Sequence, residues 1–120
     1  EQKESSVMKR SEDEALFLKV DYRYVRVQLK DIVYIEGMNE YLKFYIATGD
    51  PLLVHITFKQ LNEYLPDNFI QVHRSYMGNI NHVSEIERSV LLLSNGKRIS
   101  ISDGNRDAFM AYLSARTIKK

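Results

Sequence analysis

Apolar and polar residues alternate along most of the chain after residue 15. Between residues 24 and 29, valine and leucine occupy the odd positions, while tyrosine, arginine and glutamine occupy the even ones. A period of two is typical of strands with one face in the core and the other in solvent. The pattern predicts extended segments at residues 16–20, 24–29, 32–37 and 41–48.

Two turn signals predict that further strands pair as hairpins. Thr-Gly-Asp-Pro at 48–51 precedes the extended segment 52–56, and Gly and Pro are the residues that turns favour. Segments 89–94 and 97–101 flank Asn95-Gly96, a dipeptide that favours the type I′ turn. We therefore expect two hairpins, the second with a type I′ turn.

Two helices are expected among the strands. The first lies near 57–65, because Thr57 can cap it, Gln60 completes the spacing of a capping box, and Pro66 ends it. The second lies near 104–116 and follows Ser102 or Asp103 as its cap. Apolar residues recur along it at helical spacing and predict a packed face: Ala108, Phe109, Tyr112 and Leu113.

Length and composition favour one folded domain. The chain has 120 residues, of which 44% are hydrophobic and 28% charged, and it has no cysteine. The lack of cysteine excludes thiol catalysis, disulfides and thiolate metal sites, and suits the cytoplasm. No segment reaches the roughly 18–20 apolar residues of a membrane span, so we expect no membrane partner.

The first residues differ in composition from the rest. The first fourteen carry five acids and three bases and almost no apolar side chain. Such a segment buries too little surface to offset the entropy of ordering it. The chain begins with Glu1 rather than Met, so we expect residues 1–15 to be a polar linker from a missing upstream domain, and residues 16–120 to form the domain.

The segment 69–79, FIQVHRSYMGN, combines a strand-like apolar frame with polar side chains and has no acid. No carboxylate occurs between Asp67 and Glu85, so an approaching phosphate would meet no local repulsion. This predicts a nucleic-acid contact through four polar residues: His73, Arg74, Ser75 and Asn79.

Each of these residues also has a purely structural interpretation. His73 can pack its ring and bond to backbone, and Arg74 can pair with an acid in segment 85–87. Arg74 nevertheless favours recognition, since its planar fork suits phosphate and the guanine edge. Ser75 and Asn79 are short polar residues that commonly satisfy local backbone, and we interpret Asn79 as mainly structural.

A second polar cluster follows Gly37, and it is either a contact loop or an ordinary solvated loop. Its members are Asn39, Glu40, Tyr41 and Lys43.

No sequence motif indicates catalysis or a resident cofactor. The chain lacks nucleophile elbows, glycine-rich phosphate loops and HExxH. His73 and His82 do not have the spacing of a metal site. Asp103 and Asp107 are one helical turn apart, but a helix cap and an exposed first-turn acid explain both. We predict no catalytic residue, no metal and no cofactor.

The order of these segments resembles the LytTR DNA-binding domains that form the output end of many bacterial response regulators. The resemblance runs from IVYIEGMNEYLKFYI through HITFKQLNEYL and FIQVHRSYMGNINHV to LLLSNGKRISIS and the last helix, over roughly residues 17–113. FxxxHRSYxxN is its most specific part, and similar elements at the expected spacing make chance an inferior explanation.

The resemblance implies a mainly β fold of about ten short, mostly antiparallel strands in small sheets, with the two helices near 57–65 and 104–116. It also implies that three loops enter successive major grooves. Their residues here are Asn39 to Tyr41, Arg74, and Asp103 to Arg106, while Lys43 and Lys59 would contact phosphates.

The third loop departs from the family pattern. Many members carry a basic residue where this chain has Asp103, and a carboxylate facing phosphate is unfavourable. Either Asp103 turns inward to cap the last helix and Arg106 supplies the contact, or this loop is a weak one. We favour Arg106 as the substitute.

The leading hypothesis is sequence-specific binding to double-stranded DNA in transcriptional regulation. The expected setting is a cytoplasmic two-component response regulator, with an upstream receiver domain, a sensor histidine kinase, and a homodimer on repeated half-sites, because one copy has few positive contacts.

Two alternatives come from other classes of protein. One is a β-rich protein–protein interaction module that does not bind DNA and uses a tyrosine face. The other is a small hydrolase or metal enzyme. The residues assigned to the first are Tyr22, Tyr24, Tyr34 and Tyr41, and those assigned to the second are His73, His82 and Asp103.

Overall fold

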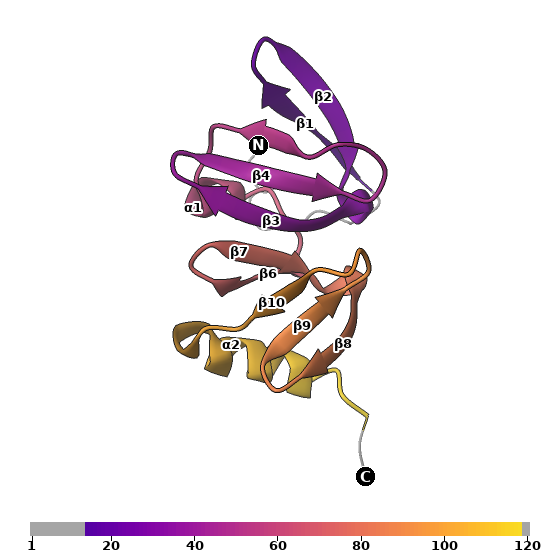
Figure 1. The fold of residues 1–120 in the computed structure, drawn as a ribbon, viewed down its shortest axis with the longest axis vertical. Helices are drawn as coiled ribbons and strands as arrows, with labels where there is room; N and C mark the ends of the chain where they lie inside the picture. The colour runs from indigo at the N-terminus through magenta and orange to yellow at the C-terminus, as the bar shows by residue number, and fades with distance from the viewer. Residues whose placement is uncertain (1–13, 119–120) are drawn as a thin grey trace, which may run out of the picture.

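The computed structural model describes residues 14–118, so the predicted linker lies almost wholly outside the described residues. Within that range the chain forms ten strands and two α-helices (Figure 1), which confirms the mainly β fold. Two 3₁₀ turns, η2 and η3, lie at 29–31 and 80–82. The strands are β1 (Ala15–Val20), β2 (Arg23–Gln28), β3 (Ile32–Met38), β4 (Tyr41–Ile46), β5 (Leu52–Val54), β6 (Phe69–His73), β7 (Tyr76–Asn79), β8 (Val83–Glu87), β9 (Val90–Leu93) and β10 (Arg98–Ser100). The helices are α1 (Phe58–Leu61) and α2 (Asp103–Ser114).

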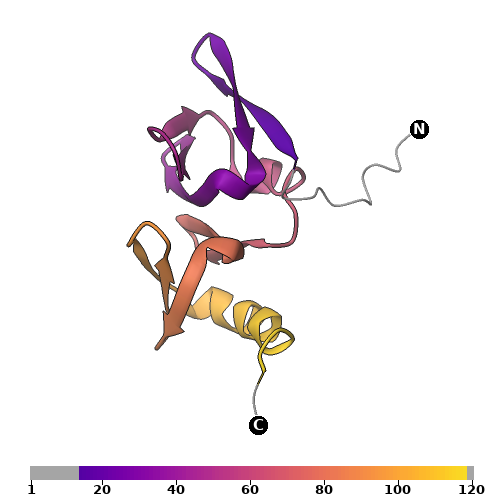
Figure 2. The ribbon, with the colours of Figure 1, turned by 90° about the vertical axis from the view of Figure 1, so that its right-hand side faces the viewer.

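The strands form three antiparallel sheets stacked along the long axis of the molecule. β1 and β2 make a two-stranded sheet at one end, a five-stranded sheet of order β5-β4-β3-β7-β6 follows, and β10-β9-β8 lie toward the other end. Figure 2 shows α2 beside the three-stranded sheet, at the end opposite the β1–β2 hairpin. The described residues extend over 49 Å in the longest direction.

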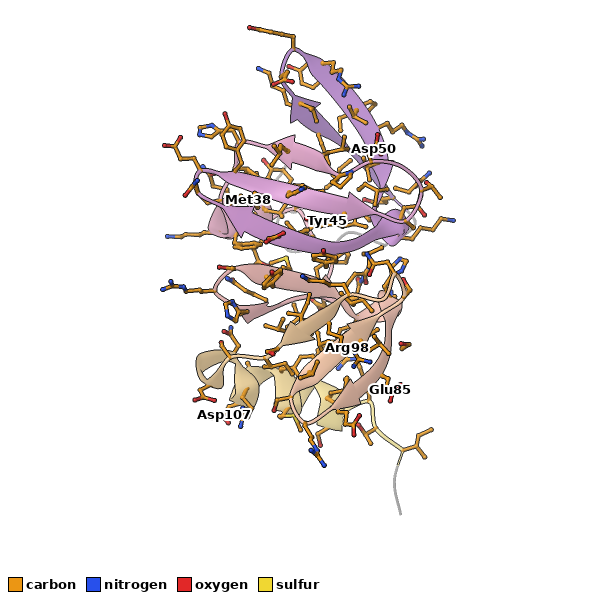
Figure 3. The ribbon with its side chains drawn as sticks, in the orientation of Figure 1. Met38, Tyr45, Asp50, Glu85, Arg98 and Asp107 are labelled. Carbon is orange, nitrogen blue, oxygen red and sulfur yellow. The ribbon has the colours of Figure 1, made fainter. Side chains whose placement is uncertain are left out.

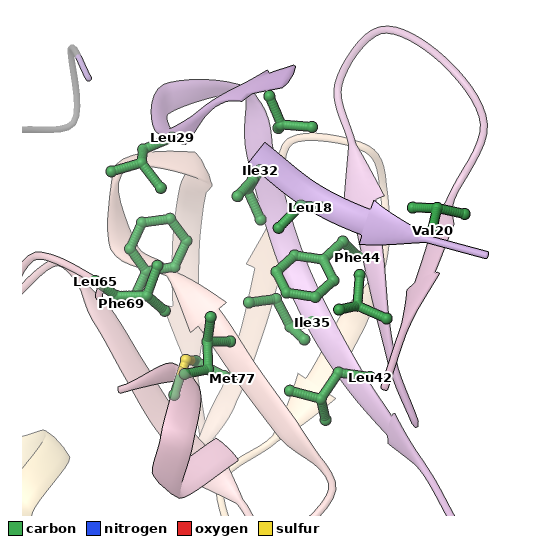
Figure 4. Close-up of a cluster of buried hydrophobic side chains, with 13 residues drawn as sticks. Leu18, Val20, Leu29, Ile32, Ile35, Leu42, Phe44, Leu65, Phe69 and Met77 are labelled. Carbon is green, nitrogen blue, oxygen red and sulfur yellow. The ribbon is translucent and has the colours of Figure 1, made fainter. Parts of the chain in front are cut away.

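The central strand β3 is buried on both faces. Ile32, Val33, Tyr34 and Ile35 are all buried, and the pairing of β3 with β4 shifts register between Ile32 and Tyr34. Ile32 and Ile35 belong to one apolar cluster, shown in Figure 4, whereas Val33 and Tyr34 belong to another. β3 therefore lies between two cores, one toward β1–β2 and one toward α2.

The first helix starts as the sequence predicts but is shorter. The Thr57 hydroxyl accepts from the Gln60 amide (3.1 Å), and the Gln60 side chain accepts from the Thr57 amide, also at 3.1 Å, which makes a capping box. The helix ends at Leu61, because the next turn tightens and the Tyr64 amide donates to the Leu61 carbonyl. The predicted end at Pro66 is therefore wrong, although Leu61 and Leu65 are buried as expected.

The second helix confirms the predicted element within two residues. Phe109 is fully buried and Leu113 packs partly against the second core. Ala108 is exposed, so its predicted place in the packed face is wrong.

Both predicted hairpins are present, β4–β5 and β9–β10, but the second has a different turn from the one predicted. Gly96 has a φ of +89°, whereas Asn95 is not among the described residues with positive φ. The Gly96 amide donates to the Leu93 carbonyl, and the Leu93 amide donates to the Lys97 carbonyl. A type I turn followed by a left-handed glycine fits these bonds, and a type I′ turn does not.

We expect Gly96→Ala to destabilise the domain by about 1 kcal/mol, because alanine is strained at positive φ. Gly104→Ala is the matched control: Gly104 lies in α2 with open space around its Cα, and alanine there should be neutral or stabilise by up to about 1 kcal/mol. Urea denaturation of both variants measures the difference. Equal effects of the two changes would contradict the turn assignment.

Candidate nucleic-acid interface

The first candidate loop is the two-residue turn between β3 and β4. Met38 pairs with Tyr41, which leaves Asn39 and Glu40 at the tip. Asn39 has a φ of +59°, a left-handed conformation that asparagine tolerates better than most residues. Asn39, Glu40 and Tyr41 are exposed, and Glu40 Oε1 lies 3.4 Å from His55 Nε2. The loop therefore presents an amide, a carboxylate and an aromatic ring to solvent.

The second loop divides the 69–79 segment into a hairpin, with Arg74 and Ser75 between β6 and β7. Its tip lacks Gly, Pro and Asn, and side chains hold it instead. The Ser75 amide donates to His73 Nδ1 at 3.0 Å. The Gln71 side-chain amide donates to the carbonyls of His73 (3.2 Å) and Arg74 (3.5 Å).

Arg74 is exposed at this tip, and no ion pair within residues 14–118 involves it. The alternative of a salt bridge to Glu85 or Glu87 therefore has no support in the described part of the chain. His73 is half-buried, with its ring 5.7 Å from that of Tyr76 in an edge-on contact. His73 thus supports the turn from which Arg74 projects.

The third loop joins β10 to α2, and here the structure corrects the prediction made from the sequence. Ser102 occupies the cap position, while Asp103 is the first residue of the helix. The Asp103 side chain is 97% exposed and pairs with Arg106 at 3.2 Å. The prediction that Asp103 turns inward as the cap is wrong, and Arg106 is exposed but has a neighbouring carboxylate.

Backbone and side-chain hydrogen bonds tie the three loops to one another. The Gly37 amide donates to the Ser75 carbonyl at 2.8 Å, which links the first loop to the second. Asn105 Nδ2 donates to the Gln71 carbonyl at 3.2 Å, and the Ser102 amide donates to the Val72 carbonyl, which link the second to the third. The three tips lie on the left-hand edge in Figure 1, called here the loop edge. Figure 3 shows Met38 and Asp107 at the same edge.

The two predicted phosphate-contacting lysines lie close to the loop edge. Lys59 is exposed on α1, which packs beside the first loop: a Cβ added to Gly37 would meet the Phe58 ring at 3.3 Å. Lys43 is half-buried on β4, with its ammonium group 5.3 Å from the centre of the Tyr45 ring.

Asn79 does not reach the surface, which corrects its inclusion among the candidate DNA contacts. It is fully buried, and its Nδ2 donates to the Ile32 carbonyl at 2.8 Å. Its Oδ1 accepts from Asn68 Nδ2 (2.7 Å) and from the Asn81 amide (3.0 Å). The interpretation of Asn79 as mainly structural fits this geometry.

The proposed tyrosine face does not form as one surface. Tyr22, Tyr24 and Tyr41 are exposed, but Tyr34 is only 4% exposed and stacks on Tyr45 with ring centres 4.2 Å apart. Burial, together with the neighbouring Tyr45 and Glu36, raises the pKa of Tyr34 above its ordinary value.

The residues of the enzyme alternative have three separate surroundings. His82 lies between Ser94 Oγ (2.8 Å) and the Lys30 carbonyl (2.7 Å), whereas His73 supports the second loop and Asp103 pairs with Arg106. Residues 14–118 contain no group of three or more histidine or acidic side chains arranged to hold a metal ion. None of the helices described is both long and apolar enough for a membrane crossing.

Comparisons with known proteins point to one family. The sequence model of the LytTr DNA-binding domain family matches residues 22–114 of this chain. The sensory transduction proteins LytT of Bacillus anthracis and Bacillus cereus are each 30% identical over 93 residues, which is 72% of this chain and 37% of the relative. The chain thus spans little more than a third of the length of these relatives. A LytTr DNA-binding domain of a methyl-accepting/DNA response regulator from Bacillus cereus has the same fold, with a TM-score of 0.72 and 24% identity, over 82% of this chain and 95% of that one.

Proposed function

Because the chain belongs to the LytTr DNA-binding domain family, we propose that it binds double-stranded DNA at specific sequences and regulates transcription. The observation that carries this proposal is the loop edge. Three loops share it and are connected by hydrogen bonds from Gly37 to Ser75 and from Asn105 to Gln71. The three loops follow one another along the long axis of the molecule (Figure 1), an arrangement that suits contact with successive grooves of a duplex.

Within this edge the side chains divide into two roles. Arg74 is the principal base-reading residue, since its five donors in a fixed plane match the two acceptors of guanine in the major groove. Asn39 and Tyr41 read from the first loop and Arg106 from the third. Lys43, Lys59 and the backbone around Ser75 set the position on the phosphates. Glu40 contributes as an acceptor, most simply for a cytosine amino group.

Arg106 is the weakest of these contacts. Its guanidinium already lies 3.2 Å from the Asp103 carboxylate, so contact with DNA must displace or share that pair. The exposed carboxylate also repels phosphate. The third loop is therefore expected to add less to binding than the second.

The proposed wider setting is that of a response regulator in the cytoplasm. Relatives named as sensory transduction proteins are longer than this chain, which supports an upstream receiver domain controlled by a sensor histidine kinase. Two copies on repeated half-sites would supply the affinity that one domain lacks. The proposal involves no covalent chemistry and no cofactor.

Selection of bound fragments from random DNA, followed by anisotropy titration between 50 and 200 mM salt, tests this function. With Lys43 and Lys59 as phosphate contacts, the logarithm of the binding constant should fall with the logarithm of salt with a slope of roughly −2 or steeper. The selected sequence should bind at least about 100-fold more tightly than an unrelated duplex. A domain that enriches no sequence and shows no salt-dependent binding does not have the proposed function.

A further inference from the structure

A groove lies beyond the first loop, between the tip of the β1–β2 hairpin and strands β4 and β5. It has a volume of about 940 Å³ and is open to solvent. The hairpin that borders it lies at the end of the molecule opposite α2 (Figure 1). Lys19 and Arg23 line it from the hairpin, and Tyr41 and Lys43 line it from β4. None of the roles assigned above uses the hairpin.

The two cations of the hairpin, Lys19 and Arg23, are both exposed. Lys19 lies between the buried residues Leu18 and Val20, so its side chain points away from the core. Arg23 is exposed beside the turn; it pairs with Val20 and therefore lies on the face of the hairpin opposite to that of Lys19. Within residues 14–118 neither Lys19 nor Arg23 forms an ion pair. Both charges are therefore available to a ligand.

The groove is electropositive. Three basic residues, Lys19, Arg23 and Lys43, line it together with one acid, Asp21. His55 also lines it, and its pairing with Glu40 puts a second carboxylate at the rim. Basic side chains around an open groove favour an extended polyanion, because such a ligand contacts several of them at once.

The groove and the loop edge share residues. Tyr41 and Lys43 belong to the strand that leaves the first loop, and the Tyr41 ring lies 5.1 Å from that of His55 on the groove wall. A duplex that runs along the loop edge beyond the first loop would therefore pass the hairpin. Lys19 and Arg23 belong to the hairpin and to none of the three loops, and they lie where the phosphates that flank the recognised sequence would be.

We infer that this groove holds the sugar-phosphate backbone of DNA next to the sequence read by the three loops, with Lys19 and Arg23 as its phosphate contacts. The inference rests on the proposed function and adds to it a second contact surface, the groove, that binds DNA independently of its sequence. Because phosphates are the same in every sequence, the groove strengthens binding to all duplexes and does not change which sequence is preferred.

The test is the double variant Lys19→Gln/Arg23→Gln. Two lost phosphate contacts should make the salt slope less steep by about 2 and weaken binding at 100 mM salt by at least about tenfold. The loss should be equal, within a factor of about two, for the selected site and for an unrelated duplex of the same length. Anisotropy titrations with both duplexes measure it, and thermal unfolding checks that each variant is folded.

The matched control is Lys30→Gln/Arg98→Gln, which also removes one lysine and one arginine charge, but from exposed positions outside the groove. It should change the slope by much less than the groove variant. Equal changes in the two variants would mean that only net charge matters, and the groove inference would be wrong. A loss confined to the selected site would also overturn it, since that would indicate base reading.

The two proposals fail in distinguishable ways. If wild-type protein binds its selected site and the groove variant keeps the wild-type slope, the groove holds something other than DNA backbone and only this inference is wrong. If the wild-type protein shows no salt-dependent binding, the proposed function is wrong and the inference falls with it.

Discussion

Replacing Arg74 by alanine is expected to weaken binding to the selected site by about 5- to 150-fold, which corresponds to roughly 1–3 kcal/mol for a lost bidentate contact to a base. Arg74 is exposed at the tip of the second loop, and no carboxylate within residues 14–118 forms an ion pair with it. The variant should also discriminate less at one base position, which a panel of single-base substitutions in the site would reveal by anisotropy.

Two further variants separate the role of the guanidinium from that of its charge. Arg74→Lys keeps the charge but not the planar fork, so it should retain non-specific binding and still lose discrimination. Arg98→Ala removes an exposed arginine away from the loop edge (Figure 3) and should change affinity little. If Arg74→Ala binds like wild type, Arg74 is not the base-reading residue.

Replacing Asn79 by alanine is expected to lower the free energy of unfolding by about 3 kcal/mol. Asn79 is fully buried and satisfies the Ile32 carbonyl and the Asn81 amide, and each orphaned buried group costs roughly 1–3 kcal/mol. In a domain of this size the melting temperature should fall by roughly 10–20 °C.

Asn62→Ala is the control for this change. Asn62 is exposed at the end of α1, and its replacement should cost less than about 0.5 kcal/mol. Urea denaturation measures both variants. A folded Asn79→Ala variant of wild-type stability that fails to bind DNA would restore Asn79 as a contact and contradict the buried role.

The predicted elements are those whose signals are local. Alternation found β1 to β4, and the Thr57 capping box found the start of α1, because each depends on neighbours within four residues. The β8–β9 hairpin escaped prediction, since its turn residues Arg88 and Ser89 both have positive φ without the usual Asn or Gly. Pairing with β9 and β10 holds that turn, and sequence patterns do not report such tertiary support.

The sequence indicates the exposed residues of the candidate site but not the residues that connect its loops inside the fold. Arg74 stands out in sequence because it lies in an acid-free segment. Gln71 and Asn105 do not stand out, yet their contact joins the second loop to the third across 34 positions in the chain. Nothing near either residue indicates the other, so only the fold reveals the pair.

The division of the molecule into two cores bears on how DNA would be recognised. The first loop joins β3, which lies between the two cores, to β4, whose Leu42 and Phe44 lie in the first core, while the third loop leads into α2, which packs on the second. The separation of these loops therefore depends on how the two cores pack across β3, and closely packed interiors do not stretch. The domain would then require a fixed rotation about the DNA axis between the base pairs that its outer loops contact. One base pair added between these contacts turns them out of alignment by about 35°. A duplex can restore the alignment only by changing its own twist, so recognition would extend to the torsional stiffness of bases that no side chain touches.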